Sequence, residues 1–161
     1  MSSWFQSYGF ADVTQNLVIG AYPLDGRDVA MLANMRVRRV LNLVEDEEYR
    51  PGEREAVEQA LSEAGIEEIR MRLTDFGQLP AEELEAAVVA VNAWLDDGMR
   101  VYVHCRAGWQ RSAAVAAGVV AMREQLDIGP ALERVQLRKP SADPLPHQRE
   151  DLVRWWEERS A

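Results

Sequence analysis

The only cysteine of this 161-residue chain, Cys105, stands six residues before Arg111, and Ser112 follows at once. Upstream, the mostly apolar residues 101–104 are typical of a buried strand, whereas the residues after Ser112 predict a helix. Gly108 lies in the turn between them, where the lack of a side chain permits a tight backbone path. A nucleophile, a turn and a helix N-terminus therefore occur together, a combination that suits a cysteine attacking phosphorus.

Such an attack requires a thiolate, because the protonated thiol is a poor nucleophile. The five residues between Cys105 and Arg111 allow the backbone to curl so that its N–H groups point at one centre. A helix that begins near Ser112 adds unpaired N–H groups and the positive end of its dipole. These donors would stabilise the thiolate and hold a phosphate. We expect the cradle to consist of Arg106, Ala107, Gly108, Trp109, Gln110 and Arg111.

Side chains of the same segment have expected roles in covalent catalysis, in which one displacement is split into two. The planar guanidinium of Arg111 suits a phosphate and the charge of a phosphoryl-transfer transition state. Ser112 can hydrogen-bond the sulfur of Cys105 and ease its departure from a phosphocysteine. His104 is expected to orient the loop and tune the thiol from behind. The structural alternative is a cysteine that serves only as a small buried hydrophobe at the end of a strand.

The pattern His104-Cys105-x-x-Gly108-x-x-Arg111-Ser112 resembles the signature loop of the cysteine-dependent protein tyrosine phosphatase superfamily. The dual-specificity branch is the most similar in length and layout. Residues 17–23 and 37–44 resemble two of its strands, and residues 138–140 with Gln148 resemble its closing segment. The resemblance implies hydrolysis of phosphomonoesters, with a phosphorylated protein or a small phosphomonoester as the partner and no cofactor or metal.

The resemblance also implies a general-acid aspartate on a mobile loop upstream of the cysteine. Asp75 lies 30 residues before Cys105 and follows the strand-like residues 66–73. It would protonate the leaving oxygen and then deprotonate the water that hydrolyses the intermediate. The alternative is a solvated turn or a helix cap. Asp96 and Asp97 are nearer to the cysteine, but their place before Gly98 indicates a surface turn at a helix end.

The alternation of elements predicts an α/β fold, a central mostly parallel twisted sheet flanked by helices, as in the layered fold of dual-specificity phosphatases. Strands are expected at 17–22, 37–44, 66–73 and 101–105, and helices at 27–35, 51–65, 80–97, 113–122 and 146–159. Pro51 is expected to open its helix and Gly65 to close it. Ligands of such sheets bind beyond the carboxyl ends of the strands, where Cys105, Asp75 and the acidic residues 45–50 would meet.

Length and composition are those of one domain over residues 1–161 with a full core. The net charge of −9 disfavours nucleic acid and anionic membranes as partners. One cysteine excludes an internal disulfide, and with only two histidines it makes a structural zinc site implausible. The N-terminus has no signal-peptide pattern, and the longest apolar run, 113–122, is far too short to span a membrane. We therefore expect a cytoplasmic enzyme without integral membrane association.

Two segments bear on the substrate, and each allows two interpretations. Residues 42–49 are similar to segments of the mitochondrial-type phosphatases that hydrolyse phosphatidylglycerophosphate, but a run of acids is usually a solvated loop. Tyr49 could stack on a phosphotyrosine ring or merely pack down. Trp109 could form a hydrophobic shelf beside the pocket or be buried under a neighbouring loop.

Three functions thus remain open. The first is a phosphatase of dual-specificity type that acts on phosphotyrosine, with or without phosphoserine and phosphothreonine. The second is the same catalyst acting on a lipid, such as phosphatidylglycerophosphate, or on another small phosphomonoester. The third is a phosphate-binding module without catalysis, which is disfavoured because Cys105, Arg111 and Asp75 are all present.

Overall fold

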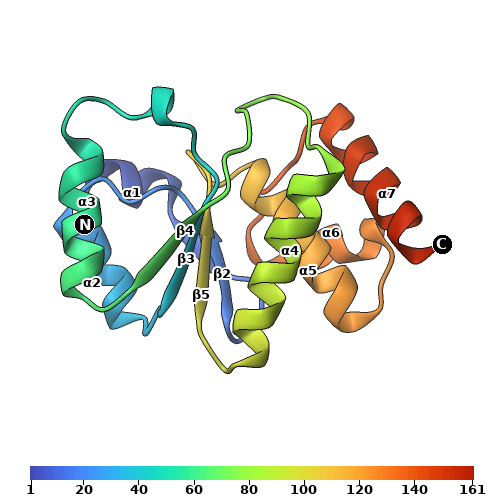
Figure 1. Ribbon diagram of the computed structural model, residues 1–161, viewed down its shortest axis with the longest axis horizontal. Helices are drawn as coiled ribbons and strands as arrows, with labels where there is room; N and C mark the ends of the chain where they lie inside the picture. Colours follow the sequence, from blue (N-terminus) through green and yellow to red (C-terminus); the bar gives the residue numbers. More distant parts are fainter.

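A five-stranded sheet between two layers of helices forms the framework of the protein, as described for residues 1–161 by a computed structural model (Figure 1). The sheet has the order β1-β2-β5-β3-β4. Its strands are β1 (Phe10–Asp12), β2 (Leu17–Gly20), β3 (Arg39–Asn42), β4 (Glu67–Arg70) and β5 (Val101–His104). Only β1 is antiparallel to its neighbour, β2, while the other pairs are parallel. The predicted fold class is confirmed.

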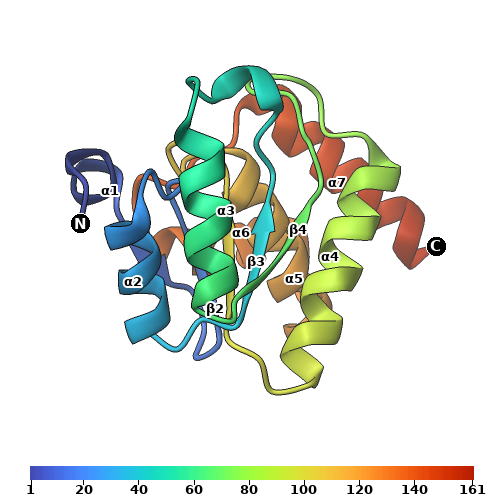
Figure 2. The ribbon, with the colours of Figure 1, turned by 60° about the vertical axis from the view of Figure 1, so that its left-hand side comes forward.

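The helices divide between the two faces of the sheet (Figures 1 and 2). One layer holds α2 (Gly26–Asn34) and α3 (Glu53–Glu63), with α1 (Ser3–Tyr8) beside α2. The other holds α4 (Ala81–Asp96), α5 (Arg111–Glu124), α6 (Ile128–Arg138) and α7 (Pro146–Ser160). A short 3-10 helix, η1 (Asp46–Glu48), follows β3. None of the helices combines the length and apolar character that a bilayer crossing requires.

Successive strand residues point to opposite faces of the sheet, and this alternation builds two cores. Leu17, Ile19 and Val103 belong to a cluster of 30 buried residues under α4 to α7. Val18 and Tyr102 belong to a cluster of 11 under α1 to α3. The larger core surrounds α5, every residue of which from Arg111 to Ala121 is buried, as its apolar sequence predicts.

Close packing of α5 depends on one glycine. A Cβ atom on Gly118 would lie 2.7 Å from Cγ2 of Val88 in α4 and 3.2 Å from the ring of Trp155 in α7. The absence of that atom lets both helices pack closely against α5.

Three elements were not predicted, and the start of a fourth was wrong. The elements α1 and β1 were missed because a six-residue helix and a three-residue edge strand are too short to show a clear period. The helix α6 was missed as well, and Gly129 and Pro130 in its first turn are residues typical of a turn. Pro51 does not open α3, because Gly52, with a φ of 86°, caps that helix and Glu53 begins it. Gly65, with a φ of 70°, does follow the helix end as expected.

The parallel strands end at one edge of the sheet, at the top of Figure 1. There β5 leads into the loop before α5, β3 into η1, and β4 into the loop before α4. Three loops from distant parts of the sequence therefore meet at this edge, as the crossover connections of a parallel sheet require.

Candidate active site

The loop between β5 and α5 is shaped by a close approach of two backbones. Gly108 has a φ of 79°, and a Cβ atom there would lie 2.6 Å from the backbone carbon of Gly20. Two hydrogen bonds hold the loop from outside. The Arg106 carbonyl accepts from the N–H of Tyr22 at 3.1 Å, and the Trp109 carbonyl accepts from the N–H of Asp143 at 2.6 Å.

The same loop leaves its backbone donors free. None of the N–H groups from Arg106 to Arg111 donates a hydrogen bond within the protein, to backbone or to side chain. Unpartnered N–H groups carry a partial positive charge, and several of them at one turn form an anion-binding concavity. The loop thus has the free donors that the predicted phosphate cradle needs.

Cys105 lies at the start of this loop and is only 3% exposed. Its Sγ is 3.3 Å from Oγ of the buried Ser112. Behind it, Nδ1 of His104 is 3.1 Å from the Cys105 carbonyl. Burial lowers the pKa of His104 to about 4, so the ring is neutral near pH 7. Because a carbonyl can only accept, Nδ1 carries the hydrogen, and the ring fixes the orientation of this peptide group.

Arg111 opens α5 and is 1% exposed, although it is charged. Its two terminal nitrogens donate to the two carboxylate oxygens of Glu48 at 2.8 and 2.7 Å. One of them also donates to the Leu73 carbonyl at 2.9 Å. Burial disfavours the cation, but the hydrogen bond to Glu48 and the nearby negative charges outweigh it and raise the pKa of Arg111. The guanidinium is therefore a fixed cation in a set orientation.

One edge of this guanidinium is left for a ligand. Glu48 occupies the edge formed by the two terminal nitrogens, while the buried Nε has no hydrogen-bond partner. Asp75 lies next to the Nε–Nη2 edge, with its Oδ1 3.2 Å from Nη2 of Arg111. A phosphate bound to Nε and Nη2 would compete with Asp75 for the cation, which links phosphate binding to the position of that carboxyl group.

A pocket of about 310 Å³ joins these groups. It is lined by Trp4, Tyr8, Asp75, Phe76, Cys105, Arg106, Ala107, Trp109, Gln110 and Arg111. Seven of the ten predicted site residues line it, and the other three, His104, Gly108 and Ser112, support the loop from behind. Trp4, Tyr8 and Phe76 are additions that the sequence analysis did not include.

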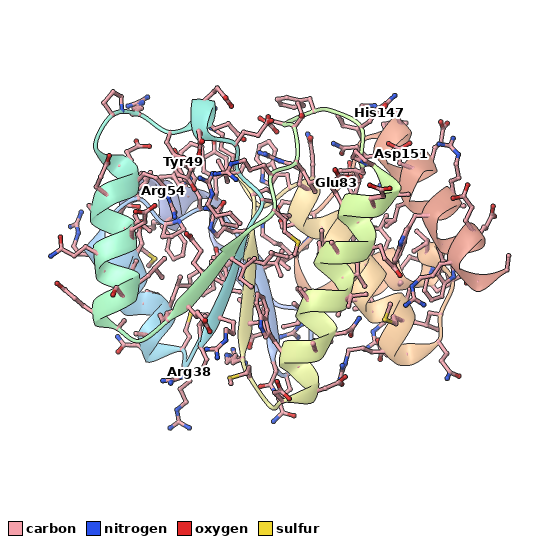
Figure 3. The ribbon with its side chains drawn as sticks, in the orientation of Figure 1. Arg38, Tyr49, Arg54, Glu83, His147 and Asp151 are labelled. Carbon is pink, nitrogen blue, oxygen red and sulfur yellow. The ribbon has the colours of Figure 1, made fainter.

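The loop that carries Asp75 is fastened to α7. Nε2 of His147 lies 3.0 Å from the carbonyl oxygen of Phe76, and Nε2 of Gln148 donates to the Gly77 carbonyl at 3.1 Å. Asp151 accepts from the N–H of Leu79 at 2.8 Å. Figure 3 shows His147 and Asp151 on α7 beside this loop. These contacts hold the loop over the pocket while Asp75 remains 28% exposed.

Glu48 is the charged partner of Arg111 that was not predicted, and for this residue the solvated-loop interpretation is wrong. Its carboxylate also accepts from the N–H of Glu45 at 2.8 Å, which closes η1 so that the side chain faces Arg111. The available signal was an acidic run directly after a buried strand at the carboxyl edge of the sheet.

The structure decides between the two interpretations of Tyr49 and between those of Trp109. The hydroxyl of Tyr49 accepts a hydrogen bond from Asn42 at 2.8 Å, and its ring lies 5.5 Å from the guanidinium carbon of Arg54. Figure 3 shows the side chains of Tyr49 and Arg54 together. Tyr49 therefore packs down and does not line the pocket. Trp109 is 44% exposed and does line the pocket, so its burial under a neighbouring loop is excluded.

Loss of the Glu48 carboxylate is expected to destabilise the fold. Glu48→Ala should lower the free energy of unfolding by about 3–5 kcal/mol, because it removes the closest anionic partner of a buried cation. Glu47→Ala, one residue earlier on the exposed side of η1, is the matched control and should change stability little. Urea unfolding of both variants measures the difference, and equal midpoints would contradict the role assigned to the Arg111–Glu48 pair.

Comparisons with known proteins agree with this geometry. The family model "Dual specificity phosphatase, catalytic domain" matches residues 18–158. The mouse protein "Phosphatidylglycerophosphatase and protein-tyrosine phosphatase 1" is 25% identical over 150 residues, which cover 92% of this chain and 77% of the mouse protein.

Solved structures show the same fold. The crystal structure of Tk-PTP in the active form superposes with a TM-score of 0.79 at 24% identity, covering 92% of this chain and 97% of that one. PTPMT1 in complex with PI(5)P gives a TM-score of 0.79 at 24% identity, covering 94% and 99%. Because the family model spans most of the sequence, the chain belongs to the family of dual specificity phosphatase catalytic domains and is a cysteine-dependent phosphatase of that type.

Proposed function

We propose that this domain, residues 1–161, hydrolyses phosphomonoesters through a phosphocysteine intermediate on Cys105, without a metal or another cofactor. One observation carries the proposal: Cys105, Arg111 and Asp75, a nucleophile, a cation and an acid from two loops, line one pocket. These are the three groups that a two-step displacement at phosphorus requires.

In the first step the Cys105 thiolate attacks phosphorus and forms a sulfur–phosphorus bond, while the bond from phosphorus to the leaving oxygen breaks. The free N–H groups of residues 106–111 and the Nε–Nη2 edge of Arg111, once Asp75 is displaced from it, hold the phosphoryl oxygens and stabilise their charge. Asp75, displaced from Arg111 by the incoming phosphate, acts here in its protonated form, the form that the second step restores. It gives that proton to the leaving oxygen, so that the product departs as a neutral alcohol.

In the second step a water attacks the phosphocysteine. The Asp75 carboxylate takes a proton from this water, the new phosphorus–oxygen bond forms, and the sulfur–phosphorus bond breaks. Ser112 hydrogen-bonds the departing sulfur, for which its Oγ at 3.3 Å is placed. His104 holds the peptide group of Cys105 through its Nδ1–H. Inorganic phosphate leaves and the thiolate is restored.

The preferred substrate is a protein phosphotyrosine, with or without phosphoserine and phosphothreonine. The alternative is a lipid or small phosphomonoester, and one observation favours it: the mouse relative carries phosphatidylglycerophosphatase as well as protein-tyrosine phosphatase in its name. The mechanism needs Cys105 as a reduced thiol, a condition that the cytoplasm provides.

A substrate panel tests this function. Phosphate release is measured at mildly acidic pH in EDTA from an aryl phosphate, a phosphotyrosine peptide, a phosphothreonine peptide and phosphatidylglycerophosphate. We expect phosphate release in the presence of EDTA. Among the peptide and lipid substrates, the phosphotyrosine peptide should be hydrolysed fastest. Loss of release on chelation would contradict metal independence. Binding of phosphate without any release would instead indicate a binding module.

A further inference from the structure

The N-terminal helix α1 forms one wall of the pocket, yet it lies outside the segment that the family model matches, residues 18–158. Two of its six residues, Trp4 and Tyr8, line the pocket. They are four positions apart, so they share one face of the helix, and their ring centroids are 4.3 Å apart. Phe5 points the other way and is fully buried in the core. The helix thus has a structural face and a face toward the site.

Two buried charged side chains fasten the ends of α1. Asp28, which is fully buried, accepts from the backbone N–H of Ser2 at 2.7 Å and from its hydroxyl at 2.6 Å. At the other end, Lys139 is 5% exposed, and its Nζ donates to the Tyr8 carbonyl at 3.4 Å. Burying a charge is costly unless it is hydrogen-bonded. Such anchors hold a six-residue helix in one position, as a pocket wall requires.

The aromatic face is also joined to the loop that surrounds the cysteine. The guanidinium carbon of Arg106 lies 5.7 Å from the centre of the Trp4 ring, within the range of a cation–π interaction. The Tyr8 ring lies 5.4 Å from the ring of Trp109. Contacts from α1 therefore reach two residues of the loop, and the neighbouring rings of Trp4, Tyr8 and Trp109 line the same pocket as Cys105.

The pocket combines a polar floor with flat apolar walls. The floor holds the thiol, the guanidinium and the free N–H groups, which suit the phosphate. Flat aromatic walls suit a flat substituent, because offset or edge-to-face contact between rings is favourable beyond the area that it buries. A serine phosphate ends in a short aliphatic stem that reaches these rings poorly.

We propose that α1 is a specificity element that selects phosphate esters of aromatic alcohols through contact of Trp4 and Tyr8 with the ring of the leaving group. This inference rests on the proposed function and extends it to a segment beyond the family match. An acyl chain could also lie on aromatic side chains, but the net charge of −9 opposes approach to an anionic membrane. Lipid selectivity is therefore an outcome of the test.

The test compares kcat/KM for three substrates in wild type, Trp4→Ala, Trp4→Phe and Gln6→Ala. The substrates are a phosphotyrosine peptide, a phosphoserine peptide of the same sequence, and phosphatidylglycerophosphate in vesicles. Trp4→Ala should reduce kcat/KM for phosphotyrosine about 10-fold more than it reduces kcat/KM for phosphoserine, equivalent to about 1.4 kcal/mol. Trp4→Phe should keep most of the preference because it keeps a ring. Gln6→Ala alters the exposed side of α1 and should have no effect. The inhibition constant of inorganic phosphate, which reports on the floor alone, should be the same in all four.

An equal loss for both peptides, or a changed inhibition constant, would reduce α1 to a structural role and overturn the inference. A loss confined to phosphatidylglycerophosphate in vesicles would overturn it in favour of a lipid-binding wall. A wild type without any Cys105-dependent release would overturn the proposed function and this inference with it, so the two failures are distinguishable.

Discussion

Cys105→Ser should abolish phosphate release while leaving inorganic phosphate bound with nearly unchanged affinity. Turnover is expected to fall by about 10⁴-fold or more, since the serine hydroxyl is a far weaker nucleophile and the covalent route is lost. Phosphate binding depends instead on Arg111 and on the free N–H groups of the loop, which this substitution does not touch. Initial rates with an aryl phosphate measure the first effect, and titration calorimetry with inorganic phosphate measures the second.

The cysteine is buried between the sheet and α5, so folding needs a control. Serine is close to cysteine in size, and Ser112 Oγ at 3.3 Å offers it a hydrogen-bond partner. The thermal midpoint of the variant should therefore stay near that of the wild type. A folded variant that kept substantial activity would show that Cys105 is not the nucleophile.

Asp75→Asn should lower kcat/KM, and the loss should be larger for substrates with poorer leaving groups. An amide cannot donate the proton that an alkoxide or phenoxide needs, so phenyl phosphate or a phosphoserine peptide should lose about 10²–10⁴-fold in kcat/KM. An activated nitrophenyl ester, which departs as a stable anion, should lose far less in the first step. Rates over a series of substituted aryl phosphates measure the change in slope.

Asp96 and Asp97 provide the matched controls, because they are also aspartates upstream of the cysteine. Asp96 ends α4 and pairs with Arg123, and Asp97 is the helix cap. Neither residue lines the pocket. Asp96→Asn and Asp97→Asn should retain wild-type rates with every leaving group. Equal losses for good and poor leaving groups in Asp75→Asn would place the acid elsewhere.

The catalytic loop could be predicted from the sequence because its information is local. Cys105, Gly108, Arg111 and Ser112 stand within eight positions, and the strand before them and the helix after them have strong apolar patterns. The family resemblance and its place after a predicted strand indicate Asp75, and the pocket brings this residue next to Arg111. Parallel strands that end at the same edge explain why the two residues meet, while the role of Asp75 as the acid stays a prediction.

The rest depends on contacts that no local pattern shows. Glu48 reaches Arg111 across 63 positions, and its neighbours have the composition of an ordinary solvated loop. Only the capped turn of η1 distinguishes it from Glu47. The six residues of α1 carry no strong helical signal of their own. Asp28 and Lys139, which are distant in the sequence, stabilise this helix instead.

Capture of the covalent intermediate shows whether Cys105 carries the phosphoryl group during turnover. Wild type and Asp75→Asn are mixed with a radiolabelled activated aryl phosphate in EDTA, quenched in acid after a short time, digested, and the labelled peptide is sequenced. Our account predicts label on the peptide that contains Cys105, with more in Asp75→Asn, because that variant forms the phosphocysteine but hydrolyses it slowly. Turnover without any protein-bound label, or label on another residue, would contradict the phosphocysteine mechanism.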